Sequence, residues 1–132
     1  IICILFFAAG FAVNYPVDFK FEYGETDYKT GEYINNNGFD ALICYVDSQL
    51  YGVLSYYAPE IPVYRPKVSQ GSPFYNIYPL SEFNVENCHR AALFIPDGAE
   101  VPAEILNGFE SAEYDRDVIT YGQKSNVFIL ER

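Results

Sequence analysis

Motifs that hold metal ions and phosphate groups are missing from this sequence. It has one histidine and three cysteines, and the cysteines form no CxxC pair, whereas structural zinc sites take several such ligands at short spacings. Neither GxGxxG nor GxxxxGK is present to cradle a phosphate, and no GxSxG turn presents a serine nucleophile. Cys88 and His89 adjoin, but the side chains of sequence neighbours seldom point toward each other. We therefore expect no metal, no cofactor and no catalytic residue in this chain.

Basic residues are also scarce. The chain has 8 lysines and arginines against 18 aspartates and glutamates, which gives a formal net charge of −10 at neutral pH. A nucleic-acid partner would require a basic surface, because affinity for the phosphate backbone comes mainly from Lys and Arg. The acidic balance therefore argues against nucleic acid, and it argues equally against adhesion of the domain to an anionic lipid surface.

Charge is absent altogether from residues 1–13, which also contain no proline. As a helix they would reach only about 20 Å, short of the roughly 30 Å core of a bilayer. We interpret them as the end of a transmembrane helix that begins before Ile1, followed by a soluble domain at residues 14–132. A buried N-terminal helix or strand and a signal peptide remain alternatives. The acidic stretch after Val13 fits the extracytoplasmic side, because lysine and arginine concentrate at cytoplasmic helix ends.

The rest of the chain alternates between helical and strand patterns. Residues 40–46 form a continuous apolar run typical of a strand covered on both faces. The patterns predict helices at 26–34, 49–57 and 102–106, strands at 40–46, 61–64, 90–95, 111–121 and 126–131, a long loop at 65–83 and a hairpin connection at 122–125. This order predicts a three-layer α/β fold with a mostly parallel sheet and a C-terminal antiparallel hairpin. The sequence does not decide whether Cys44 and Cys88 form a disulfide.

Ligands of open α/β sheets bind beyond the carboxyl ends of the strands. In this sequence Asp47 and Ser48 follow the first predicted strand, Arg65 the second and Asp97 the third. These four residues are our candidate binding site, with Arg65 as a ligand for an anion or hydroxyl and Asp47 as an acceptor. In the structural alternative, which we favour, Asp47 caps the following helix and Arg65 pairs with a surface carboxylate.

Two other patterns concern tyrosines and carboxylates. Of thirteen tyrosines, six lie within residues 51–78, and they suit sugar rings, a membrane interface or packing against a partner domain. Glu113, Asp115 and Asp117 alternate along one predicted strand. Their spacing predicts that all three carboxylates share one solvent-facing side of that strand.

The order of several segments resembles that in a family of membrane enzymes. A Tyr33-Ile34 pair before an asparagine run is followed by DALICYVDSQ, by LYGVLSYYAPEIPVYRP and, at the C-terminus, by NVFILER. The most telling piece is Tyr56-Tyr57-Ala58-Pro59 before a short strand. Together these segments resemble the C-terminal extracytoplasmic domain of polytopic glycosyltransferases of the protein mannosyltransferase and aminoarabinose transferase type.

The resemblance implies an accessory domain of an integral-membrane transferase that uses a polyprenyl-phosphate sugar donor. Its partners would be the membrane-embedded part of the same polypeptide and a polyprenyl-phosphate sugar or glycan acceptor. The catalytic acids of that family lie in an early extracytoplasmic loop, to which no position of this sequence corresponds, so no catalytic residue is carried over. The alternative function is a membrane-tethered binding or interaction module without catalysis, and a small soluble enzyme has the least support.

Overall fold

The computed structural model describes residues 22–46, 49–68 and 76–132. The predicted membrane-helix end at residues 1–13 lies outside these residues, as do the predicted site residues Asp47 and Ser48. Within the described ranges, no helix combines the length and the apolar character that a membrane crossing needs.

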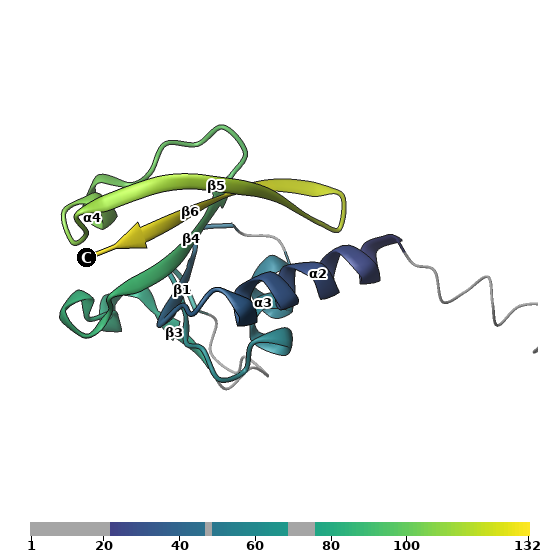
Figure 1. The fold of residues 1–132 in the computed structure, drawn as a ribbon, viewed down its shortest axis with the longest axis horizontal. Helices are drawn as coiled ribbons and strands as arrows, with labels where there is room; N and C mark the ends of the chain where they lie inside the picture. Colours follow the sequence, from purple (N-terminus) through teal and green to yellow (C-terminus); the bar gives the residue numbers. More distant parts are fainter. Residues whose placement is uncertain (1–21, 47–48, 69–75) are drawn as a thin grey trace, which may run out of the picture.

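Six strands form one mixed sheet in the order β3-β2-β1-β4-β6-β5 (Figure 1). β1, β2, β3 and β4 are parallel, whereas β6 pairs antiparallel with both β4 and β5. The strands are β1 (Ala41–Cys44), β2 (Val63–Arg65), β3 (Ile77–Pro79), β4 (Arg90–Pro96), β5 (Ser111–Thr120) and β6 (Gln123–Glu131). The predicted α/β fold with a mostly parallel sheet and a C-terminal hairpin is confirmed.

Each face of the sheet carries its own hydrophobic core. On one face, α2 (Glu22–Asn36) and α3 (Leu50–Tyr57) pack against alternate strand residues, with Ile34 and Leu54 fully buried. On the other face, α4 (Ala103–Leu106) and two short 3-10 helices, η1 (Leu80–Glu82) and η2 (Val85–Asn87), form the cover. The arrangement gives three layers, with a sheet between two unequal helical layers.

β1 shows how the apolar run determines this arrangement. All four of its residues are buried, and they alternate between the two cores: Leu42 and Cys44 face the α2–α3 side, and Ala41 and Ile43 face the other. Cys88 belongs to the second core. Both Cys44 and Cys88 are free thiols on opposite faces of the sheet, so the question of a disulfide between them is answered in the negative.

β3 lies within the segment that we predicted to be a loop. Its three residues pair with β2 in the register Val63 with Ile77, and only Ile77 is buried. The side chain of Asn76 donates to the carbonyl of Ile61 at 2.8 Å, and the amide of Val63 donates to the carbonyl of Asn76. These bonds attach a strand that is too short and too proline-rich to show a pattern of its own.

Helix starts also differ from the predictions. α2 begins at Glu22, several residues before the predicted start near Thr26. α3 begins at Leu50, and Gln49 occupies its N-cap position without a side-chain cap hydrogen bond. The helix therefore starts one residue later than predicted.

The hairpin turn is tighter than predicted. Thr120 pairs with Gln123, so Tyr121 and Gly122 alone form the turn, with φ of 50° and 74°. Two left-handed residues are typical of a type I′ turn, whose twist matches that of the flanking strands. Most of the predicted connection at 122–125 thus belongs to β6.

A bulge in β5 changes which carboxylates share a face. Glu113 pairs with Ile129 and Asp117 with Asn126, and the register shifts between Tyr114 and Arg116. Because the partners Asn126 and Ile129 are three residues apart on β6, they face opposite sides of the sheet. The prediction that Glu113, Asp115 and Asp117 share one side is therefore wrong.

Candidate functional site

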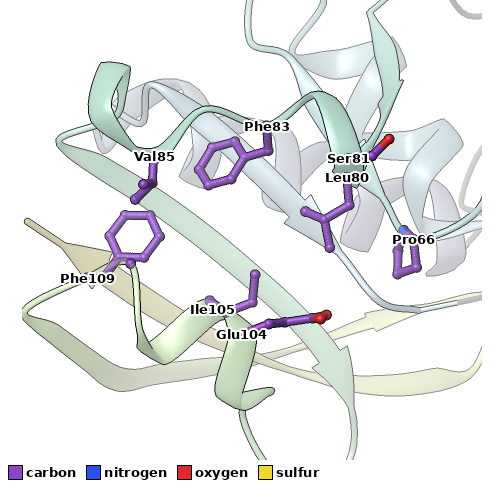
Figure 2. A pocket seen from close by; sticks show the side chains of 9 residues that line it. Pro66, Leu80, Ser81, Phe83, Val85, Glu104, Ile105 and Phe109 are labelled. Carbon is purple, nitrogen blue, oxygen red and sulfur yellow. The ribbon is translucent and has the colours of Figure 1, made fainter.

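A pocket of about 500 Å³ lies on the face of the sheet that α4 and the 3-10 helices cover (Figure 2). Its walls come from Pro66 after β2, from the segment between β3 and β4, and from the segment between β4 and β5, so the pocket extends along this face of the sheet. The apolar lining is formed by Pro66, Leu80, Phe83, Val85, Ile105 and Phe109. Figure 2 shows Leu80, Phe83 and Val85 facing Ile105 and Phe109 across the gap.

Aromatic rings form one end of this pocket. Phe83 and Phe109 lie nearly parallel, with ring centroids 6.2 Å apart and an interplanar angle of 18°. Tyr64 of β2 meets Phe83 edge to face at 5.0 Å. This aromatic series holds the Phe83 ring in place, so the wall is already formed without a ligand.

Glu104 supplies a negative charge at the opposite end, where Figure 2 shows its carboxylate directed toward Pro66. The hydroxyl of Tyr45, the first residue after β1, donates a hydrogen bond to Oε1 of Glu104. Burial and this carboxylate raise the pKa of Tyr45, so its hydroxyl stays protonated and continues to donate. The pocket thus combines an apolar body with one anchored carboxylate.

The predicted rim residues that the structure describes have other contacts. The guanidinium carbon of Arg65 lies 3.8 Å above the ring of Tyr51 in α3. Asp97 accepts a hydrogen bond from Nδ2 of Asn126 at 3.1 Å and lies 3.3 Å from Nζ of Lys124. Neither Arg65 nor Asp97 lines the pocket.

Asp97 belongs to an exposed network that joins the loop after β4 to the hairpin. Lys124 pairs with both Asp97 and Asp117, and Asn126 also donates to Asp117 at 2.7 Å. The amide of Gly98 donates to Oδ1 of Asn126 at 2.8 Å. Hydrogen bonds from Lys124, Asn126 and Tyr114 lower the pKa of the Asp117 carboxyl. These contacts therefore hold the loop after β4 against the β5–β6 hairpin.

Cys88 lies in the same core as the pocket but is not primed for nucleophilic chemistry. Its side chain is 3% exposed, and burial raises its pKa to about 11. The thiol is therefore protonated at neutral pH, whereas a nucleophilic cysteine acts as the thiolate. Across residues 22–46, 49–68 and 76–132, no three His, Cys, Asp or Glu side chains group as a metal site would require.

Sequence reasoning did not identify the pocket residues. Phe83 was placed within a loop, and Phe109 was not assigned to any element. Two large apolar residues beside short helical turns were the available signal, because such residues in connecting segments usually cover a sheet face. Comparisons with protein-family models, curated proteins and solved structures gave no match, so geometry alone supports the interpretation of this site.

Proposed function

We propose that this domain is a binding module whose pocket beside α4 takes an aromatic or aliphatic group with a positively charged end. The observation that carries the proposal is the combination of the Phe83–Phe109 wall with the Glu104 carboxylate at the far end of the same pocket. The apolar body would enter between the rings and Ile105, and the cationic end would meet Glu104.

Size and charge both support this ligand class. A volume of about 500 Å³ falls in the range of small-molecule sites, which are mostly apolar with a few fixed polar groups. The net charge of −10 raises the local concentration of cations and repels anions. An apolar cation therefore fits the pocket better than an apolar acid of the same shape.

A pair of probes with the same ring and opposite charge tests the proposal. Phenethylamine and 3-phenylpropionate would each be titrated into the labelled chain while backbone amides are followed by NMR. We expect saturable shifts at Phe83, Ile105, Gly108 and Phe109 with phenethylamine, and weaker ones with 3-phenylpropionate. Absence of saturable shifts at these positions with phenethylamine would overturn the proposal.

Glu104→Gln separates the charge from the apolar wall. The ratio of the affinity for phenethylamine to that for 3-phenylpropionate should fall about tenfold, the scale of one charge-assisted contact. Both probes should still bind through their rings. Glu60→Gln is the matched control, since it removes the same charge from an exposed residue that does not line the pocket. An unchanged preference in Glu104→Gln would show that the carboxylate does not select the ligand.

The accessory role in a membrane glycosyltransferase, which rests on the resemblance described above, stays a prediction. It agrees with a binding module, because an accessory domain acts through binding. If coding sequence precedes Ile1, it separates the two alternatives: several apolar spans would favour a polytopic transferase, and a single span would favour a tethered module.

A further inference from the structure

A second pocket, of about 280 Å³, lies on the opposite face of the sheet. α2 contributes Asp27 to its lining, and the β5–β6 turn contributes Tyr121. The remaining lining comes from α3 and its N-cap residue, with Gln49, Gly52, Val53, Tyr56 and Tyr57. Because this pocket shares no lining residue with the first, an inference about it does not depend on the function proposed above.

Asp27 is unusual within this pocket. Its side chain is only 7% exposed, and its Oδ1 atom is buried without a hydrogen-bond partner among the described residues. Burial raises the pKa of its carboxyl above the ordinary value. A buried carboxylate is costly unless a donor or an opposite charge compensates it. Lys29 is only two residues further along α2, so it lies on another face of the helix, and it pairs with Glu25 at 2.9 Å.

Three tyrosines also line this pocket. Tyr56 and Tyr57 meet edge to face with ring centroids 5.0 Å apart, and Tyr28 meets Tyr57 edge to face at 6.2 Å. Tyr56 is 73% exposed and Tyr121 55%, so both offer aromatic surface at the pocket mouth. The faces of such rings carry negative electrostatic potential and attract ammonium groups.

We propose that this pocket binds a small organic ammonium ion, with Asp27 as its counter-ion and the Tyr56 and Tyr57 rings as its walls. An ammonium group supplies the opposite charge that the buried carboxylate lacks, and one that carries an N–H also donates the missing hydrogen bond. A sugar hydroxyl would satisfy the hydrogen bond and leave the charge uncompensated. The buried charge of Asp27 therefore favours an ammonium ion over a sugar, the other ligand to which tyrosine rings are suited.

Tetramethylammonium chloride is the probe for this site, and tert-butanol is its neutral counterpart of similar shape. Both would be titrated at constant ionic strength into the full 132-residue chain while backbone amides are followed by NMR. We expect saturable shifts at Gly52, Tyr56 and Tyr121 with tetramethylammonium, and affinity for tert-butanol at least about tenfold weaker. Equal affinity for the two, or saturable binding of methyl glucoside without binding of tetramethylammonium, would overturn the proposal.

Variants test the two walls separately. Asp27→Asn keeps the shape and should weaken tetramethylammonium binding about tenfold or more, since it removes the counter-ion. Tyr56→Ala should weaken binding about fivefold, whereas Tyr56→Phe, which keeps the ring, should stay within about twofold. Because Tyr56 is largely exposed, these two variants leave the core intact and keep the test valid even if Asp27→Asn alters folding.

Tyr114→Ala is the matched control, because Tyr114 is also exposed but packs against Phe128 on the other side of the sheet. It should bind tetramethylammonium as the unmodified chain does. If Asp27→Asn and Tyr56→Ala both bind as the unmodified chain does, the site is not where we place it.

Discussion

On one face of the sheet, helices of 15 and 8 residues lie over the strands, whereas the other face is covered by a four-residue helix and two three-residue turns. The core beneath the long helices includes the fully buried Leu50, Leu54 and Phe94. Beneath the short elements, Phe83 and Phe109 remain only partly buried. The core under the long helices is therefore continuous, and the pocket under α4 is the larger of the two described pockets.

The difference follows from how helices present side chains. A helix of several turns places successive side chains in one stripe, so it can fill a sheet face continuously. A single turn supplies one or two side chains, and Ile105 is the buried residue that α4 offers. Short covering elements thus leave space that a ligand can enter, while their aromatic neighbours keep the space apolar.

Alanine substitutions in the two covers should give the largest contrast. Leu54→Ala in α3 should cost about 3 kcal/mol of unfolding free energy, because Leu54 is fully enclosed. Ile105→Ala in α4 should cost about 1 to 2 kcal/mol, because one side of Ile105 already borders the pocket. Urea unfolding followed by circular dichroism measures both. Equal losses would show that the two faces are equally well packed.

Two glycines sharpen the same comparison. A Cβ atom on Gly31 of α2 would come within 2.5 Å of Cβ of Tyr57 in α3, an atom fixed to the backbone. Gly31→Ala should therefore lower stability by about 1 to 3 kcal/mol, even though alanine favours helices. On the open face, a Cβ on Gly108 would lie 2.9 Å from a methyl group of Val85, which can move into the pocket.

Gly108→Ala should accordingly cost less than about 1 kcal/mol. Thermal melts of the two alanine variants give the comparison directly. A larger loss for Gly108→Ala than for Gly31→Ala would mean that the pocket does not relieve the clash.

Elements with a repeating or continuous residue pattern were predictable from the sequence. Elements whose formation depends on a single tertiary contact were not. β1 was predictable, because a continuous apolar run has to be covered on both faces. β3 was not, since three residues that end in Pro79 carry no periodicity and depend on bonds to Asn76. The bulge beside Asp115 likewise has no local signal, although it decides which side each carboxylate takes.

The sites followed the same rule. The expectation of a ligand site at the carboxyl edge of the sheet follows from strand direction alone, and it stays a prediction. The pocket residues were not predictable, because Phe83 and Phe109 meet only through the packing of two connecting segments. The second pocket depends on the close approach of α2 to α3 at Gly31, a tertiary contact that no spacing in the chain reveals.

Asp27→Asn should raise stability, in contrast to the substitutions above. Burial raises the pKa of the Asp27 carboxyl in the folded chain above its ordinary value of 3.8, so ionisation favours the unfolded state. The unmodified chain therefore loses stability as pH rises from 3.8 through the folded-state pKa, and the variant does not. At neutral pH we expect a gain of about 1 kcal/mol, because the variant removes the negative charge that burial penalises and keeps a side chain of the same shape.

Melting curves at pH 3 and pH 7 check the sign. The two proteins should melt alike at the lower pH, where both side chains are neutral, and differ at the higher one. A variant less stable than the unmodified chain at pH 7 would show that the ionised carboxylate has a partner in the folded chain.

The smallest effect concerns the edge of the helix-covered face, where Arg65 lies over Tyr51 at 3.8 Å. Arg65→Gln and Tyr51→Leu should each lower stability modestly, and their double-mutant cycle should give a coupling of about 0.5 to 1 kcal/mol, as for other half-exposed cation–π pairs. A matched pair lies at the opposite edge of the same face, where the guanidinium of Arg116 lies 3.8 Å from the ring of Tyr33. Its double-mutant cycle uses Arg116→Gln and Tyr33→Leu. Urea unfolding of the single and double variants measures both couplings. A coupling near zero for the Arg65–Tyr51 pair beside a clear one for the Arg116–Tyr33 pair would mean that the stacking of Arg65 on Tyr51 adds little to stability at this edge.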